Sequence, residues 1–479
     1  MSTPSPRTTP AEPGTEPLGT EPLDTVLARA TTAAESARRA RPADRARWLE
    51  SVAAALDAAA ARLVPVACRE SHLPEGRLSG ELGRTTFQAR LFAERLASGA
   101  LDDIRVDHAD PHWPMGARPD IRRTTVPLGP VLVFAASNFP FAFSVMGGDT
   151  VSALAAGCPV VVKAHPGHPE LSRLTTSIAT EALAAAGAPA HLLQLIEGER
   201  TGADAVQDHR VKAVGFTGST RGGRYLFDLA VSRPDPIPFY GELGSTNPVV
   251  VTPAGWAERP ADIAAGFAAS CTLGAGQFCT QPGVVFVPDA DAFFGSLPPL
   301  TAGPMLGERI AAGYAAALDD LAARDRVCTA LRSPGEDGHP DIALLRTTTD
   351  AVLADPSLIT TEVFGPASLF VEYGDLSEVE AVLAGFEGAL TGTVQGGDTP
   401  DEDGRRLLDL LAGHVGRVIW NQWPTGVTVS DAQQHGGPWP SSTAPRTTSV
   451  GTAAIDRWRR PVAYQNVPAD ALPRELRDQ

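Results

Sequence analysis

Cysteine is scarce in this chain of 479 residues. The five thiols are an odd number, no two of them form a CxxC pair, and no cysteine and histidine stand at a spacing suited to zinc. A small disulfide scaffold is therefore excluded, and the sequence predicts neither disulfides nor a bound metal. The cysteines are Cys68, Cys158, Cys271, Cys279 and Cys328.

Positive charge and long apolar runs are also lacking. Lysine and arginine number 40 against 56 aspartates and glutamates, a net charge of -16, so the field of the chain repels phosphate backbones and anionic lipid surfaces. No run of about 18 apolar residues occurs, and the N-terminal sequence has no basic stretch followed by an apolar one. We therefore expect no nucleic-acid or membrane partner and a cytoplasmic location.

Strands and helices alternate along the first half of the chain. Residues 1–24 are rich in Pro, Thr and Glu and predict a disordered tail, and amphipathic helices follow as far as about residue 100. A β-branched run, PLGPVLVFAASNFP, then predicts a strand buried on both faces. This alternation is typical of an α/β fold with a doubly wound parallel sheet. It continues with helices over 144–156, 169–186 and 201–208 and strands over 159–163, 191–196 and 211–216.

A second α/β region follows. Strands at NPVVV, GVVFV and ASLFVEY and a helix over 261–271 predict a catalytic domain over 242–420, after a dinucleotide-binding domain over 25–241. The remaining segment, 421–479, ends in RRPVAYQNVP, which reads as a strand. We expect this segment to complete the site and to pair with a ribbon near 115–127 in a small oligomerisation sheet.

Two residues suggest covalent chemistry. Cys279 lies in GQFCTQPG between a helix and a strand, where a thiol can face a cleft, although an isolated cysteine is more often buried and structural. Glu242 ends a short apolar stretch and could equally be a cap or a surface charge. Together they form the pair needed for acyl chemistry, a soft nucleophile and a carboxylate base. A cysteine protease would need a histidine partner, and the sequence identifies none among its ten.

Phosphate binding is suggested more weakly. No GxGxxG follows a strand, but VGFTGSTRGGR at 214–224 predicts a strand, a turn and a helix whose N-terminus can hold a pyrophosphate. A plain strand-to-helix turn would look the same. Lys163 ends a buried strand, where the carboxyl edge of a parallel sheet meets its ligand.

Six motifs in order carry a family resemblance: SNFP (137–140), VVVKAHP (160–166), FTGS (216–219), ELGSTNP (242–248), GQFCT (276–280) and EVFGP (362–366). From about residue 25 onward the sequence resembles the aldehyde dehydrogenase superfamily. Within it, VKAHPGHPELS, HGGPWPSS, RTTSVGT and RPVAYQNVP are similar to the branch of 2-oxoglutarate semialdehyde (2,5-dioxopentanoate) dehydrogenases, which also contains NADP-dependent fatty aldehyde enzymes.

The resemblance implies the catalytic roles. Cys279 would attack the aldehyde, and Asn138 with the Cys279 backbone N–H would hold the oxyanion. Glu242 would activate the water that hydrolyses the resulting thioester. The implied reaction oxidises 2,5-dioxopentanoate to 2-oxoglutarate through a thiohemiacetal and a thioester. A broad-range or fatty aldehyde dehydrogenase using NADP is the alternative. More remote are a CoA-acylating enzyme, which would not need Glu242, and a non-catalytic binding protein, which would be expected to lose Cys279 or Glu242.

The resemblance also implies the binding residues. Pro166 stands where many NAD-preferring relatives have a glutamate that repels a 2'-phosphate, so NADP is the expected cofactor and NAD is possible. The substrate side would include Phe139 and Arg84, a candidate anchor for a substrate carboxylate, although Arg84 could instead pair with Glu81 on the solvent face. We expect a homodimer or homotetramer. The implied cofactor residues are Lys163, His165, Arg200, Gly218, Ser219, Glu362 and Phe364.

Overall fold

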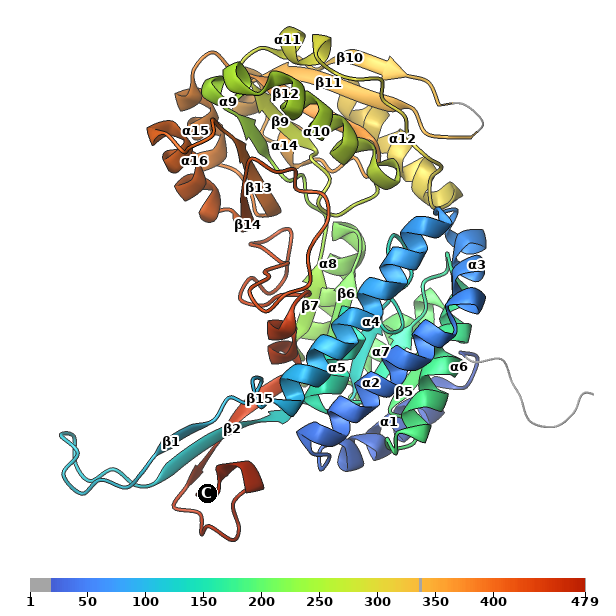
Figure 1. The fold of residues 1–479 in the computed structure, drawn as a ribbon, viewed down its shortest axis with the longest axis vertical. Coiled ribbons are helices and arrows are strands. Elements are labelled where there is room, and N and C mark those ends of the chain that lie inside the picture. The colour runs from blue at the N-terminus through green and yellow to red at the C-terminus, as the bar shows by residue number, and fades with distance from the viewer. Residues whose placement is uncertain (1–18, 336–337, 479) are drawn as a thin grey trace, which may run out of the picture.

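The computed structural model describes residues 19–335 and 338–478, so residues 1–18 of the predicted tail lie outside the described residues. Helix α1 (Leu23–Ala37) begins at Leu23, so the last two residues of the predicted tail, 23 and 24, are helical. Figure 1 shows two α/β units one above the other, with a narrow ribbon projecting from the lower one.

The lower unit is built on a five-stranded sheet in the order β5-β4-β3-β6-β7. All neighbouring strands are parallel, which confirms the predicted doubly wound sheet. The strands are β3 (Val131–Phe134), β4 (Val160–Lys163), β5 (Leu193–Ile196), β6 (Ala213–Thr217) and β7 (Phe239–Glu242).

Helices cover both faces of this sheet because alternate strand residues point to opposite sides. On one face Val131 and Val133 pack with helices α2 to α6, and on the other Leu132 and Val161 pack with α1, α7 and α8. Besides α1, the helices are α2 (Pro42–Ala58), α3 (Ala60–Ser71), α4 (Glu75–Ala97), α5 (Gly148–Ala156), α6 (Pro169–Ala185), α7 (Glu199–Gln207) and α8 (Thr220–Val231).

Helix α5 begins four residues later than the sequence predicts. The apolar residues before it form a turn, and the buried Glu81 carboxylate on α4 accepts the backbone N–H groups of Phe141 and Ala142. Those N–H groups therefore serve a loop beside the end of β3 instead of a helix.

The upper unit has a seven-stranded sheet in the order β10-β11-β12-β9-β8-β13-β14, in which only β10 and β11 are antiparallel. It confirms the expected second sheet. Its strands are β8 (Val249–Val251), β9 (Val284–Val287), β10 (Cys328–Ser333), β11 (Ile342–Thr348), β12 (Ala367–Glu372), β13 (Ala389–Gln395) and β14 (Val415–Trp420). Its helices are α9 (Pro253–Glu258), α10 (Pro260–Thr272), η1 (Leu273–Gly276), α11 (Ala290–Gly295), α12 (Glu308–Ala322), α13 (Thr349–Ala354), α14 (Ser357–Thr360), α15 (Leu376–Ala384) and α16 (Glu402–Ala412).

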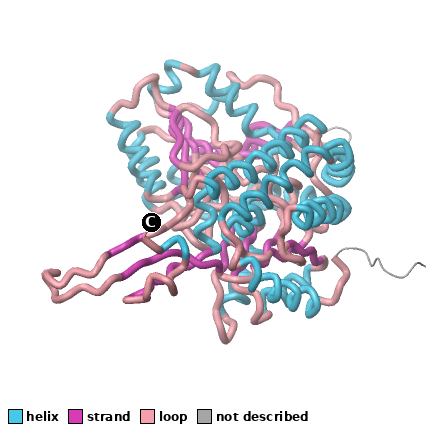
Figure 2. The backbone as a smooth tube through the Cα atoms, turned by 60° about the horizontal axis from the view of Figure 1, so that its bottom comes forward, coloured by secondary structure: helices cyan, strands magenta, loops and turns pink. Residues whose placement is uncertain are grey.

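The ribbon is a three-stranded antiparallel sheet of β1 (Arg105–Asp107), β2 (Ile121–Pro127) and β15 (Arg459–Gln465), and it extends away from both units in Figures 1 and 2. The pairing of β15 with β2 confirms the predicted contact between the C-terminal strand and the ribbon. A short helix, η3 (Arg474–Leu476), follows β15.

The segment between β14 and β15 crosses from the upper unit back to the lower one (Figure 1). It exchanges backbone hydrogen bonds with the end of β7, where Leu243 N donates to Ser441 O and Thr443 N donates to Gly241 O. It ends in η2 (Thr452–Trp458), whose buried Arg457 forms an ion pair of 2.7 Å with Asp149 on α5. The segment is thus fixed to both units.

Among the described residues, no single helix has both the length and the apolar character needed to cross a membrane, and only α2 and α3 together, bent by 73°, meet that test on length and composition.

Candidate active site

The three predicted catalytic residues meet between the two units. Asn138 follows β3, Glu242 is the last residue of β7, and Cys279 lies between η1 and β9. All three line one cavity of about 690 Å³. Asn138 and Glu242 lie at the carboxyl ends of parallel strands, the edge where α/β folds bind ligands, and the loop before β9 brings Cys279 to the same edge.

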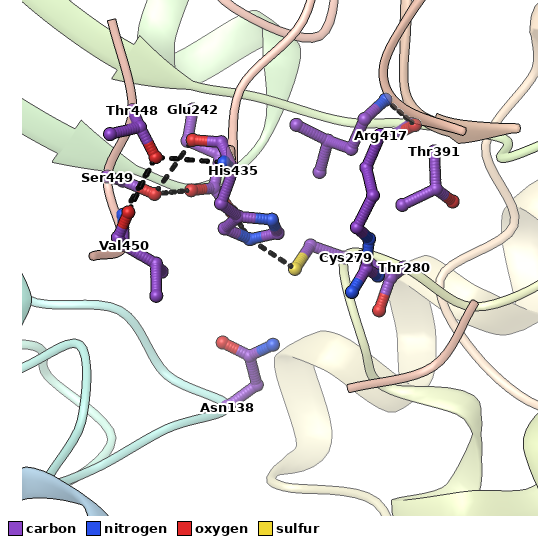
Figure 3. Close-up of polar contacts among 12 residues, drawn as sticks. Asn138, Glu242, Cys279, Thr280, Thr391, Arg417, His435, Thr448, Ser449 and Val450 are labelled. Atoms are coloured by element: carbon purple, nitrogen blue, oxygen red, sulfur yellow. Dashed lines mark hydrogen bonds and ion pairs between the residues drawn. The ribbon is translucent and has the colours of Figure 1, made fainter. Parts of the chain in front are cut away.

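His435 joins Cys279 to Glu242. Its Nε2 atom lies 3.5 Å from the Cys279 Sγ and 2.9 Å from Oε1 of Glu242, and the Ser449 hydroxyl donates to the other carboxylate oxygen (Figure 3). The imidazole is 1% exposed. Because the same nitrogen faces both groups, it can donate to the carboxylate or accept from the thiol but not both at once, and the three groups together can take up the thiol proton.

Sequence analysis did not find His435 or Ser449, because both are far from Cys279 in the chain. The available signal was HGGPWPSS, which begins with His435, and RTTSVGT, which contains Ser449. Two hydrogen bonds hold the segments of His435 and Ser449 together. His435 N donates to Thr448 Oγ1 over 2.8 Å, and Ser449 N donates to His435 O over 2.8 Å. The predicted nucleophile therefore has a histidine partner, supplied by the C-terminal segment that was expected to complete the site.

Burial and charge set the protonation of this cluster. Burial raises the pKa of the Cys279 thiol well above its ordinary value, Glu242 raises it further, and the nearby Arg417 guanidinium opposes the rise. Burial alone would also raise the pKa of Glu242, but His435, Ser449 and Cys279 together hold it below its ordinary value. At neutral pH the resting site therefore has a protonated thiol and an ionised carboxylate.

Asn138 faces the thiol across an open space (Figure 3). Its side-chain Nδ2 donates to the backbone carbonyl of Gln277 over 3.0 Å, and its backbone carbonyl accepts from Arg77 Nη2 over 2.7 Å. The Arg77 guanidinium itself lies over the rings of Phe139 and Phe278, 5.2 and 5.0 Å from their centroids. These contacts fix a side-chain amide near the atom where a tetrahedral oxyanion would form.

The other end of the cavity fits a dinucleotide. Ser219 caps the N-terminus of α8, so the first turn of a twelve-residue helix can offer N–H groups to a pyrophosphate. Gly244 lies so close to Glu362 that a Cβ atom on residue 244 would stand 2.3 Å from the Glu362 carboxylate. Burial raises the pKa of Glu362 to about 7. The predicted cofactor residues that line this cavity are Lys163, His165, Gly218, Ser219, Glu362 and Phe364.

Arg200 is not among the lining residues. Its side chain is 95% exposed and lies 3.8 Å from Asp204, one turn along α7. The first turn of α7 presents Glu199 to the cavity instead, paired at 2.8 Å with Arg309 of α12. Pro166 leaves no carboxylate three residues after Lys163, but Glu199 comes from a neighbouring element and lies close enough to Lys163 to influence its pKa.

Arg84 does not form the predicted alternative pair with Glu81. Glu81 is buried and holds the loop after β3, and the structure places the Arg84 guanidinium 5.5 Å from the centroid of the Phe143 ring. The Nη2 atom of Arg84 is buried and has no hydrogen-bond partner among the described residues. Phe139 packs on Phe143 with their centroids 5.4 Å apart, so both predicted substrate residues lie beside the cluster but outside the lining of the large cavity.

Comparisons with known proteins show the family of this chain. The family model described as "Aldehyde dehydrogenase family" matches residues 14–458. The alpha-ketoglutaric semialdehyde dehydrogenase 2 of Azospirillum brasilense is 45% identical over 92% of this chain and 86% of its own length. The alpha-ketoglutaric semialdehyde dehydrogenase of Acinetobacter baylyi is 40% identical over 91% and 84%. A crystal structure of bifunctional proline utilization A (PutA) has the same fold, with a TM-score of 0.79 at 21% identity over 92% of this chain, which spans 44% of that protein.

Proposed function

Because this chain belongs to the aldehyde dehydrogenase family and is an aldehyde-oxidising oxidoreductase, we propose that its substrate is 2,5-dioxopentanoate and its product 2-oxoglutarate. The two relatives above, which are 40% identical or more, are named for this semialdehyde. A broad-range or fatty aldehyde substrate is the competing function.

The observation that carries this proposal is the unpaired guanidinium of Arg84. An arginine nitrogen that is buried without an acceptor carries a desolvation penalty, and a substrate carboxylate would supply the acceptor. The planar fork of arginine matches a carboxylate with two hydrogen bonds. The charges of Cys279 and Glu242 influence the pKa of Arg84, and we propose that a short oxo-acid spans from this anchor to the thiol.

The residues then act in a fixed order. The thiol proton passes through the His435–Glu242 pair to solvent as Cys279 Sγ attacks the aldehyde carbon, which gives a thiohemiacetal oxyanion. The Asn138 amide and the Cys279 backbone N–H hold that charge. The nicotinamide cofactor, when bound, supplies the hydride acceptor. Glu242 then takes a proton from the water that cleaves the thioester, which favours hydrolysis over transfer to CoA.

We propose NADP as the preferred cofactor, with NAD possible. Lys163, His165 and Arg309 line the far end of the cavity, and a 2'-phosphate could take Arg309 from its ion pair with Glu199. Phosphate is the better acceptor for arginine because it offers more charge and more oxygens. Glu199 itself favours a ribose hydroxyl, so the balance between these two groups would set the preference.

We also propose that the chain forms a homodimer or homotetramer through its ribbon. The residues between β1 and β2 expose Trp113 and Met115, and Met115 is 91% exposed. Apolar side chains at the end of a projecting antiparallel sheet are suited to contact with a second copy.

The substrate proposal is tested with a panel of aldehydes and two matched variants. Arg84→Met should raise KM for 2,5-dioxopentanoate roughly tenfold, since a charge-assisted contact of about 1.5 kcal/mol is lost, and should leave hexanal turnover equal or improved. Arg90→Met is the control, because Arg90 on the same helix pairs with Glu50 and Asp57 at the surface. If wild-type enzyme prefers hexanal, or both substrates respond alike to Arg84→Met, the broad-range function replaces the proposed one.

A further inference from the structure

The catalytic cluster also brings together three atoms that can bind a metal. Sγ of Cys279, Nε2 of His435 and a carboxylate oxygen of Glu242 all lie within 4.8 Å of one another (Figure 3). A thiolate, a neutral imidazole and a carboxylate are the donors that Zn²⁺ binds in proteins. The sequence alone does not indicate such a site, because the three ligand residues are far apart in the chain, at positions 242, 279 and 435.

The spacing is close to that of a tetrahedral zinc site. With Zn–S of about 2.3 Å and Zn–N and Zn–O of about 2.0 to 2.1 Å, tetrahedral ligands stand about 3.5 Å apart from sulfur to nitrogen and about 3.4 Å apart from nitrogen to oxygen. The observed Sγ–Nε2 distance is 3.5 Å and the Nε2–Oε1 distance is 2.9 Å. The contact between imidazole and carboxylate has to open by about half an ångström on the same geometry, and the Sγ and carboxylate oxygen, within 4.8 Å of each other, have to lie on the same ion.

Hydrogen bonding leaves these atoms incompletely satisfied. Nε2 of His435 can carry one proton and faces both the thiol and the carboxylate. Oε1 of Glu242 is buried and accepts no hydrogen bond of good geometry from the described residues, and Nδ1 of His435 has no partner among them. A dication at the centre would interact favourably with all three ligand atoms at once.

The cluster is accessible to an ion. Cys279 and Glu242 both line the large cavity, so a fourth position on a metal would face that cavity and could hold water. We propose that Zn²⁺ binds reversibly to Cys279, His435 and Glu242 and holds the enzyme in an inactive state. Binding forms three ligand bonds and releases the thiol proton to solvent, with no change in oxidation state.

This inactive state follows from the chemistry of the ligands. A metal-bound thiolate cannot attack an aldehyde, and a metal-bound carboxylate cannot accept a proton from water. The inhibition rests on the proposed function, whereas the binding does not. The test therefore measures binding directly, on full-length protein freed of metal with a chelator.

The first measurement is titration with Co²⁺ followed by absorption, together with Zn²⁺ stoichiometry by competition with a chromogenic chelator. We expect one ion per chain, a thiolate-to-cobalt charge-transfer band, and protection of Cys279 from iodoacetamide that a chelator reverses. His435→Gln and Glu242→Gln should each weaken Zn²⁺ at least tenfold, and Cys279→Ser should remove the cobalt band. Thermal unfolding checks that each variant is folded, and having two independent ligand variants keeps the test decisive if one of them is not.

Cys328→Ser is the matched control, because Cys328 is an exposed thiol on β10 outside the site. It should leave the stoichiometry, the cobalt band and the Zn²⁺ affinity unchanged. Binding that disappears in Cys328→Ser, or that survives in both ligand variants, would overturn the proposal. A protein that binds Zn²⁺ at this cluster yet oxidises no aldehyde would refute the proposed function and leave the metal site intact.

Discussion

Replacing Glu242 with glutamine separates two roles that this carboxylate could have. If it activates water, the variant still forms the thioester but hydrolyses it slowly. If it instead draws the proton from Cys279, the variant loses the first step as well. The structure distinguishes the two through the electrostatics of the thiol, because burial and the charge of Glu242 both raise the pKa of Cys279. Removing the charge should therefore lower that pKa.

The magnitude follows from the distance between the groups. The sulfur and the carboxylate oxygen are within 4.8 Å, and two unit charges at that separation interact by about 3.5 kcal/mol at an effective dielectric constant of about 20. That energy corresponds to a shift of about 2.5 units in the pKa of Cys279. The His435 imidazole lies between the two groups and reduces the effect, so we expect the pKa of Cys279 to fall by about 1 to 2 units in Glu242→Gln.

Two assays check this expectation. The pH dependence of iodoacetamide alkylation, corrected with Cys279→Ser for the other thiols, should move to lower pH in Glu242→Gln. A stopped-flow experiment should show a burst of reduced cofactor followed by a weak steady state. Glu50→Gln is the control, since Glu50 is exposed and pairs with Arg90. An unchanged or raised pKa together with loss of the burst would refute the reasoning and make Glu242 the base for the thiol.

Three further outcomes are expected. Cys279→Ser should abolish aldehyde oxidation while cofactor affinity, measured by calorimetry, stays unchanged, and near-normal turnover would contradict the role of this thiol. Arg309→Ala should raise KM for NADP about tenfold, and should raise it more than KM for NAD, because a charge-assisted contact with the 2'-phosphate is lost. Arg200→Ala, at an exposed position, is the comparison. A larger rise in KM for NADP in Arg200→Ala than in Arg309→Ala would favour Arg200 as the phosphate ligand. Arg457→Met should lower the free energy of unfolding, measured in urea, by about 3 to 5 kcal/mol, because it leaves Asp149 buried without its partner. The control, Arg62→Met at an exposed position, should change it by less than about 0.5 kcal/mol. Equal effects of the two substitutions would show that the ion pair contributes nothing.

The sequence predicted most of the fold because its signals are local. The strands around 160–163 and 213–217 are continuous β-branched or apolar runs, and the helices between them have clear amphipathic spacing. The start of α5 was misplaced because the apolar residues before it form a turn, part of which Glu81, some sixty residues earlier, holds through the N–H groups of Phe141 and Ala142. No local pattern reveals such a contact.

The same distinction between local signals and distant contacts applies to the residues of the site. Cys279, Glu242 and Asn138 could be identified because each lies in a short motif beside a strand end. His435 could not be assigned a role, because its contact with Cys279 depends on the path of a long segment from one unit to the other. The helix predicted over 201–208 begins two residues earlier, at Glu199, and it is Glu199 and not Arg200 that lines the cavity, because sequence patterns do not fix a helix start to within one or two residues.

The segment between β14 and β15 gives the molecule an order of assembly. Cys279 and Glu242 leave the ribosome well before His435, Ser449 and Arg457, and chains fold from the N-terminus as they are made. Until the late segment docks on β7 and α5, Glu242 lacks its imidazole partner and the thiol lacks its proton acceptor. A nascent chain therefore carries both residues through most of its synthesis without the imidazole that joins them, and the complete cluster arrives with the segment that continues into β15 of the ribbon.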